Sequence, residues 1–161
     1  MAQGNRRDQL IAYIEGNQQA FYRLAYSYVR NSDQALDVVQ EAIVKALTKV
    51  HLLRNPEYMR TWFYRILVNE SLMVLRRAKR HPVEDIPLDV LSSEDRDVSR
   101  SLDLYKAVST LEPKYRTVIT LRYFEDMKLE EIARITGANL NTVKSRLYRA
   151  LEILKGTLKE A

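Results

Sequence analysis

Polar and basic side chains recur at helical spacing near the C-terminus, in the segment KLEEIARITGANLNTVKSRLYRAL at 128–151. Leu129, Ile132 and Ala133 share one face of an expected first helix, and Gly137 can take the positive φ that ends it. A second helix should then start before Val143. This arrangement predicts a helix-turn-helix.

The second helix of this motif has an apolar seam and a polar face. The seam is expected to contain Val143, Leu147 and Leu151. The residues turned away from it are polar or basic, and they suit a DNA major groove: Thr142, Ser145, Arg146 and Arg149. A pair of core-packing helices with solvated cations fits this segment alone about equally well, since helical hairpins are common.

A second stretch, EYMRTWFYRILVNESLMVLRRAKR at 57–80, interleaves aromatic and basic side chains. Basic residues can follow a phosphate backbone, and an aromatic face can stack on an unpaired base. Single-stranded nucleic acid is therefore a candidate ligand. The alternative is a core role, which we expect for at least two of the four aromatic residues, Tyr58, Trp62, Phe63 and Tyr64.

An acidic surface is predicted on the helix that precedes this stretch. Asp37 and Glu41 are four residues apart, so they are neighbours on one helix face, and Gln40 lies beside them. A solvated face is the default interpretation. The more specific one is a docking surface for a basic partner helix.

Helices must position all of these groups, because no β-type alternation appears anywhere in the chain. We expect Gly16 to end a first helix, Asn17 to cap the second, and Asn31 with Gln34 to form a capping box for the third. Pro113 suits the first turn of a later helix. The third helix should bury one apolar stripe: Leu36, Val39, Ile43, Ala46, Leu47 and Val50.

The predicted fold is all-α, with two small helical domains joined by a flexible linker. Residues 5–80 form the first domain and residues 101–161 the second, which contains the helix-turn-helix. Residues 81–100 hold two of the chain's four prolines and carry 2 basic against 6 acidic residues, which is typical of a linker. The flanking segments are basic, with 13 against 7 in residues 1–80 and 11 against 8 in residues 101–161.

Composition excludes several classes of site. The chain has no cysteine, and its two histidines, His51 and His81, are isolated, so we expect no metal site and no disulfide. We also expect no cofactor and no small-molecule substrate. No apolar run approaches the roughly 20 residues that span a bilayer, which favours a cytoplasmic protein. The net charge of +5 favours a polyanionic partner, but so modest an excess is equally compatible with a role in solubility.

Four blocks of this sequence form a recognisable set: DVVQEAIVKA at 37–46, TWFYRILVNESL at 61–72, LEPKYRTVITLRYFEDMKLEEIA at 111–133 and NTVKSRLYRA at 141–150. Together they resemble bacterial sigma factors of the small, two-domain extracytoplasmic-function group. Their order and spacing match the family over nearly the whole chain. The resemblance implies a subunit that recruits core RNA polymerase to promoters, with a −10-reading domain at 5–80 and a −35-reading domain at 101–161.

The resemblance also assigns roles to residues. The face with Asp37, Gln40 and Glu41 would dock on the clamp helices of the polymerase β′ subunit, and the C-terminal domain on the β flap. The −10 strand would be captured and melted by Arg54, Tyr58, Trp62, Asn69, Arg76, Arg77 and Arg80. The −35 duplex would be contacted by Thr142, Lys144, Ser145, Arg146, Tyr148 and Arg149, with Arg146 on phosphate. Family members are usually held inactive by an anti-sigma partner.

Three other functions compete with this hypothesis. A sigma-like adaptor that binds an anti-sigma protein without DNA would have a degenerate second helix, yet Lys144, Arg146 and Arg149 are present. An ordinary helix-turn-helix regulator would account for residues 101–161 but not for 31–80. An enzyme would need a nucleophile, a metal cluster or converging acid–base groups, and no such spacing occurs, so we expect no enzymatic activity.

Overall fold

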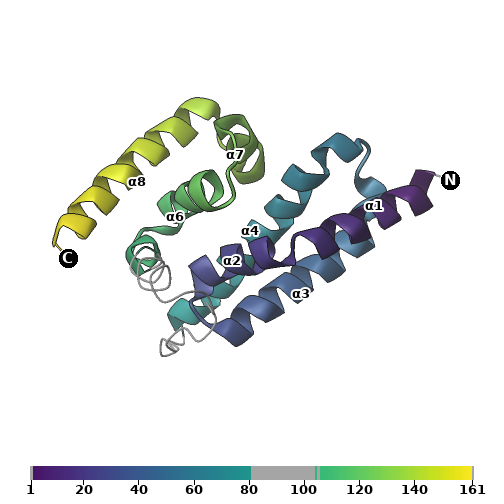
Figure 1. Cartoon of the computed structure of the whole chain (residues 1–161), viewed down its shortest axis with the longest axis horizontal. Helices are drawn as coiled ribbons and strands as arrows, with labels where there is room; N and C mark the ends of the chain where they lie inside the picture. Colours follow the sequence, from purple (N-terminus) through teal and green to yellow (C-terminus); the bar gives the residue numbers. More distant parts are fainter. Residues whose placement is uncertain (1, 81–103, 105, 161) are drawn as a thin grey trace.

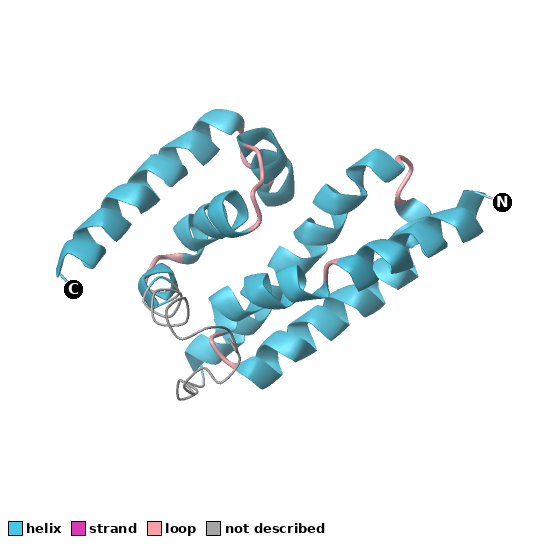
Figure 2. Cartoon of the chain, viewed as in Figure 1, coloured by secondary structure: helices cyan, strands magenta, loops and turns pink. Residues whose placement is uncertain are grey.

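The computed structural model describes residues 2–80, 104 and 106–160, and this part of the chain is helical with short connections and no strand (Figures 1 and 2). The all-α prediction is confirmed. The expected linker at 81–100 and the side chain of Arg80 lie outside the described residues.

The N-terminal domain consists of four helices that lie together on one side of Figure 1. They are α1 (Ala2–Gly16), α2 (Gln18–Val29), α3 (Ser32–Lys49) and α4 (Met59–Arg80), with two 3₁₀ turns, η1 (Val50–Leu52) and η2 (Pro56–Tyr58), between α3 and α4. Phe21, Leu24, Phe63 and Leu67 are fully buried where α2 and α4 meet. Burial of such side chains supplies the main driving force for this packing.

Two helix starts in this domain were predicted, and they differ in outcome. Asn31 caps α3 as expected, because its side-chain oxygen accepts a hydrogen bond from the Gln34 backbone N–H at 2.9 Å. The structure shows this half of the predicted capping box. Asn17 stands at the N-cap position of α2 as predicted, and its carbonyl accepts from the Phe21 N–H at 3.1 Å. Its side chain makes no capping bond, and the side-chain amide donates instead to the Tyr13 carbonyl at 2.7 Å, in the last turn of α1.

The C-terminal domain contains α6 (Pro113–Ile119), a π-helical turn η3 (Thr120–Phe124), α7 (Leu129–Thr136) and α8 (Leu140–Glu160). Pro113 stands in the first turn of α6 as predicted. Gly137 ends α7 with φ of 74°, and the Asn139 side chain then accepts from the Thr142 N–H at 2.8 Å at the start of α8. The predicted helix-turn-helix is therefore α7, this turn and α8.

Two residues expected in the core are exposed instead. Leu36 lies on the outside of α3, where the buried stripe is made mainly of smaller residues, including Ala35, Val38 and Ala42. Small residues allow α2 and α4 to approach α3 closely, and Leu36 is rotated about 100° from Ala35 along the helix. Leu151 is likewise exposed on α8, where the seam continues through Ala150 and Leu154.

Within the described residues, no helix combines the length and apolarity needed to span a membrane.

Candidate nucleic-acid and polymerase interfaces

The outer face of α8 is polar, basic and accessible. Lys144, Ser145, Tyr148 and Arg149 are all exposed, while Val143 on the opposite side is fully buried. Tyr148 is 67% exposed and lies among these polar and basic groups. The helix thus presents one continuous surface of hydrogen-bond donors and cations that can enter a DNA groove.

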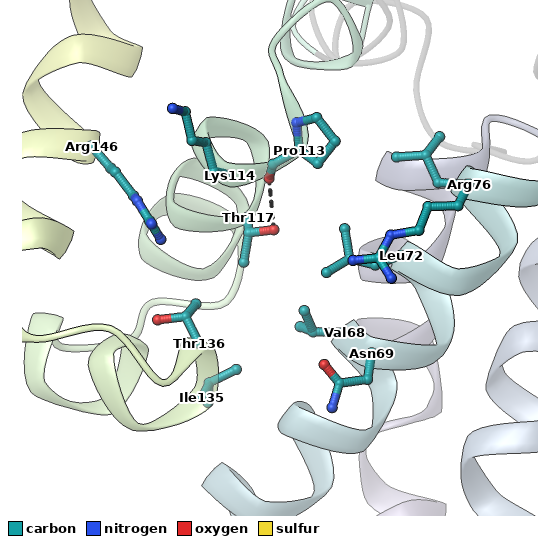
Figure 3. A pocket seen from close by; sticks show the side chains of 11 residues that line it. Val68, Asn69, Leu72, Arg76, Pro113, Lys114, Thr117, Ile135, Thr136 and Arg146 are labelled. Carbon is teal, nitrogen blue, oxygen red and sulfur yellow. Dashed lines mark hydrogen bonds between the residues drawn. The ribbon is translucent and has the colours of Figure 1, made fainter. Parts of the chain in front are cut away.

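Arg146 and Thr142 are half-buried, unlike the other predicted residues of α8. Arg146 lines a cavity of about 340 Å³ between the two domains, opposite Asn69 and Arg76 of α4. Figure 3 shows Arg146 reaching in from one side and Asn69 and Arg76 from the other. The structure therefore brings one predicted −35 residue together with two predicted −10 residues.

The aromatic residues of the 57–80 stretch divide into core and surface. Phe63 and Tyr64 are buried, with the Phe63 ring centroid 4.4 Å from that of Phe21. Tyr58 is 45% exposed and Trp62 is half-buried. The expectation that at least two of the four belong to the core is confirmed, and Tyr58 and Trp62 are left as candidates for base stacking.

The outer face of α3 carries acidic and apolar groups side by side. Asp37, Gln40 and Glu41 are exposed, and so are Leu36 and Val44, one turn away on either side of Gln40. A surface that combines apolar and charged side chains is suited to contact with a partner helix. This favours the docking interpretation of the α3 face over that of a face exposed only to solvent.

Arg77 and Arg54 lie apart from the other predicted −10 residues. Arg77 lines a groove between α3 and α4 together with Asp37 and Glu41, so it is grouped with the predicted polymerase-docking face. Lys45 and Glu70 also line this groove, and the ion pair between them joins α3 to α4. Arg54 is exposed in the loop between η1 and η2.

A cluster of polar contacts joins the two domains around Glu125, in the loop after η3. The Glu125 carboxylate accepts a hydrogen bond from the Tyr64 hydroxyl at 2.8 Å and forms an ion pair with Arg23 at 3.3 Å. Arg60 donates to the Glu125 carbonyl at 2.8 Å, and Arg23 donates to the Phe124 carbonyl at 3.2 Å. Burial raises the pKa of Glu125, and the charge of Arg23 opposes that rise.

A second set of interdomain contacts lies where α6 meets the end of α2. Arg116 donates to the Tyr28 carbonyl at 3.0 Å and to the Ser109 and Leu111 carbonyls at 2.7 and 3.0 Å. The Tyr28 hydroxyl is hydrogen-bonded to Thr117. Both groups are buried, and this burial lowers the pKa of Arg116 and raises that of Tyr28. Arg116 thereby satisfies a carbonyl that the end of α2 leaves without a helical partner.

Among the described residues, no cluster of histidine, cysteine and acidic side chains could hold a metal ion.

Comparison with known proteins gives two family matches in the expected order. Residues 13–81 match the family described as Sigma-70 region 2, and residues 101–154 match Sigma-70, region 4. The RNA polymerase sigma factor SigV of Bacillus subtilis is 50% identical over 147 residues, which is 91% of this chain and 89% of that protein. The ECF RNA polymerase sigma factor SigW of the same organism is 30% identical over 86% of this chain and 83% of that protein. The chain belongs to the extracytoplasmic-function sigma factors. It is a sigma factor that directs transcription initiation.

Solved structures support the same fold for this sigma factor. The sigma factor RpoE of Bartonella quintana, in complex with the anti-sigma factor NepR, superposes with a TM-score of 0.77 at 26% identity, covering 92% of this chain and 95% of that one. CnrH in complex with the cytosolic domain of CnrY has a TM-score of 0.74 at 20% identity, over 94% and 88% of the two chains. The latter likeness concerns the fold.

Sequence reasoning did not find the interdomain contacts of this sigma factor. The partners of Glu125 are 61 to 102 positions away along the chain, and Arg116 is 88 positions from Tyr28. Arg60 was expected only as one of the basic residues of the 57–80 stretch, and no role was predicted for Arg23. No local signal marks Glu125, because a carboxylate that follows an apolar helical segment is usually exposed.

Proposed function

We propose that this sigma factor binds core RNA polymerase through the outer face of α3 and reads promoters with α8 and α4. The α8 helix would read the −35 duplex, and the surface of α4 with its preceding loop would hold the melted −10 strand. The observation that carries the proposal is the exposed face of α8, where Lys144, Ser145, Tyr148 and Arg149 share one side of a helix-turn-helix. Residues 5–80 and 101–161 are the proposed functional domains.

The docking part of the proposal rests on the α3 face. Asp37 and Glu41 are exposed, and the structure gives neither of them an ion pair, so they contribute little to the stability of the fold. Their charge is then available for a basic partner surface, which we propose to be the clamp helices of β′. Leu36 and Val44 would add apolar contact area to the same interface.

The test is a charge reversal at both acidic positions. The Asp37→Lys, Glu41→Lys protein should keep its circular dichroism spectrum and lose at least tenfold in competition for purified core RNA polymerase. The matched control is Asp8→Lys, Glu15→Lys, which reverses two exposed carboxylates on α1 and should compete like the unmodified protein. Equal competition by both variants would remove the α3 face from the interface.

The −10 part of the proposal concerns Tyr58 and Trp62, the two accessible aromatic residues among the four of the 57–80 stretch, with Arg54, Asn69, Arg76, Arg77 and Arg80. With the full chain bound to core polymerase, single-stranded −10 non-template DNA should bind more tightly than the duplex. Affinity should fall steeply with salt because each neutralised phosphate releases counterions. Trp62→Ala should remove most of the preference for single strand, since base stacking on an aromatic ring contributes about 1–3 kcal/mol. A variant that keeps the preference would contradict strand capture by this helix.

The family membership supports a proposal for the partners and the location. We propose that an anti-sigma protein holds this chain, by analogy with the RpoE–NepR complex, and that the protein acts in the cytoplasm beside the polymerase. Its role would be recognition alone, with no catalytic activity of its own.

A further inference from the structure

A cavity lies where α4 of the N-terminal domain meets α6, α7 and α8 of the C-terminal domain. Its volume of about 340 Å³ is within the range of small-molecule sites, which runs from roughly 300 to 1,000 Å³. A space of this size does not hold a DNA duplex, so a ligand that fills it is a small molecule.

The charged side chains that line this cavity are all basic. They are Arg76 of α4, Lys114 of α6 and Arg146 of α8, and no aspartate or glutamate is among the lining residues. Lys114 has a carboxylate nearby, because its ammonium lies 4.0 Å from Glu112. Within the residues that the structure describes, neither Arg76 nor Arg146 forms an ion pair. Cations around one space repel one another, and an anion between them would relieve that repulsion.

The positions of the two arginines indicate which anion fits. Figure 3 shows Arg76 and Arg146 reaching into the cavity from opposite sides, with Thr117 between them. A guanidinium binds phosphate through two parallel N–H···O bonds. Because the arginines approach from opposite sides, a chain of phosphate groups can contact both, whereas one phosphate ion would contact only one. The pair therefore suits a polyphosphate.

The rest of the lining is apolar, with a few uncharged polar groups. Val68 and Leu72 of α4 and Ile135 of α7 form an apolar wall, and Asn69 and Thr136 lie beside it. A nucleobase has apolar faces and edges that donate and accept hydrogen bonds. The Asn69 amide both donates and accepts, so it can pair with such an edge. An inorganic polyphosphate would leave this wall without a partner.

We propose that this cavity is a binding site for a nucleoside polyphosphate. The phosphate chain lies between Arg76 and Arg146, and the base lies against Val68, Leu72 and Ile135. The site goes beyond the proposed function, because the ligand is a small molecule and its binding requires neither polymerase nor promoter DNA.

The test uses ATP as the probe and the full chain without polymerase, in magnesium-free buffer. Backbone amide shifts in proton–nitrogen NMR spectra should saturate with a Kd of about 1 mM or tighter. The largest shifts should lie around the cavity, at Asn69, Thr117 and Thr136. Inorganic tripolyphosphate has a similar phosphate chain without the nucleoside. It should bind at least about fivefold more weakly, because it makes no contact with the apolar wall.

Three variants separate this site from a general attraction between a basic protein and an anion. Arg76→Gln, Arg146→Gln should weaken ATP binding at least about tenfold, because it removes both guanidinium groups. Arg7→Gln, Arg65→Gln removes the same charge from exposed positions outside the cavity and should bind ATP within about twofold of the unmodified protein. Asn69→Asp keeps both arginines and adds a carboxylate to the cavity, so it should also weaken binding. All three variants should keep the circular dichroism spectrum of the unmodified protein.

Several results would overturn the site. Shifts that spread over the outer face of α8 instead of the cavity, or equal weakening by the two arginine pairs, would show that ATP acts only as a general counterion. Equal affinity for ATP and tripolyphosphate would refute the nucleoside contact. Failure of the chain to bind core polymerase or promoter DNA would count against the proposed function alone, since the ATP titration contains neither.

Discussion

Replacing Arg149 with alanine should remove discrimination at one or two base pairs of the −35 element. Arg149 is exposed on α8, and its guanidinium lies 3.3 Å from the Glu152 carboxylate in an i,i+3 ion pair. The side chains of the pair are 60% and 71% exposed, so exchanging Glu152 for a base edge costs at most about 1 kcal/mol. A bidentate contact to guanine contributes about 1–3 kcal/mol. When the ion pair costs the full 1 kcal/mol, the difference is about 0–2 kcal/mol, which predicts a loss of up to roughly 30-fold, confined to the correct base.

The assay is binding of the polymerase-bound variants to a library of single-base −35 changes. Arg146→Ala serves as the comparison, because a phosphate contact should weaken all sequences about equally and lower the salt slope by about 1. Glu152→Gln is a second control, which frees Arg149 and should tighten binding to the preferred sequence by no more than about fivefold. Uniform weakening of every sequence by Arg149→Ala would refute base readout by this residue.

Three further predictions concern stability. Phe63→Ala should lower the free energy of unfolding by about 3–5 kcal/mol in urea titrations, because Phe63 is fully buried against Phe21. A loss under about 1 kcal/mol would show that neighbouring side chains move in to fill the cavity. Gly137→Ala should lower the free energy of unfolding by about 1–2 kcal/mol, because φ at this position is 74°. Gly156→Ala, within α8, should raise the free energy of unfolding by up to about 1 kcal/mol. Equal effects of the two substitutions would contradict this explanation from backbone conformation. Burial raises the pKa of Glu125, which interacts electrostatically with Arg23, Tyr64, Arg60 and Tyr13, and the folded protein therefore binds a proton more readily than the unfolded chain. The contribution of Glu125 to stability should therefore fall as pH rises above the ordinary glutamate pKa of 4.5. The thermal stability of the unmodified protein should accordingly decline relative to that of Glu125→Gln as pH rises. A pH-independent difference between the two proteins would contradict the raised pKa.

Local patterns in the sequence were sufficient for the helices and for the exposed face of α8. Gly137, Pro113 and Asn31 act within one turn of their own position, so spacing alone predicted their roles. Asn17 shows the limit of this reasoning, because an amide between two helices can serve the end of one or the start of the next.

Burial was harder to predict where a helix has two apolar sides. Leu36 is apolar and in register with the core stripe of α3, yet the smaller Ala35 is buried in its place. The choice depends on how closely α2 and α4 approach, which the α3 sequence does not contain. The same holds for the proposed site as a whole. Spacing could not predict that Arg77 would line a groove with Asp37 and Glu41, apart from Asn69 and Arg76, or that the C-terminal domain would lie against α4.

The chemical make-up of the interdomain contact has a thermodynamic consequence. Exposing apolar surface raises heat capacity and exposing polar surface lowers it. The boundary between the domains holds both kinds of group: Val68, Leu72, Leu75 and Ile135 line the cavity, while Arg23, Glu125 and Arg116 make the polar contacts. Separating the domains should therefore involve a smaller heat-capacity change than exposing apolar surface alone would give, and ions should directly weaken the Arg23–Glu125 pair, whose arginine is partly exposed.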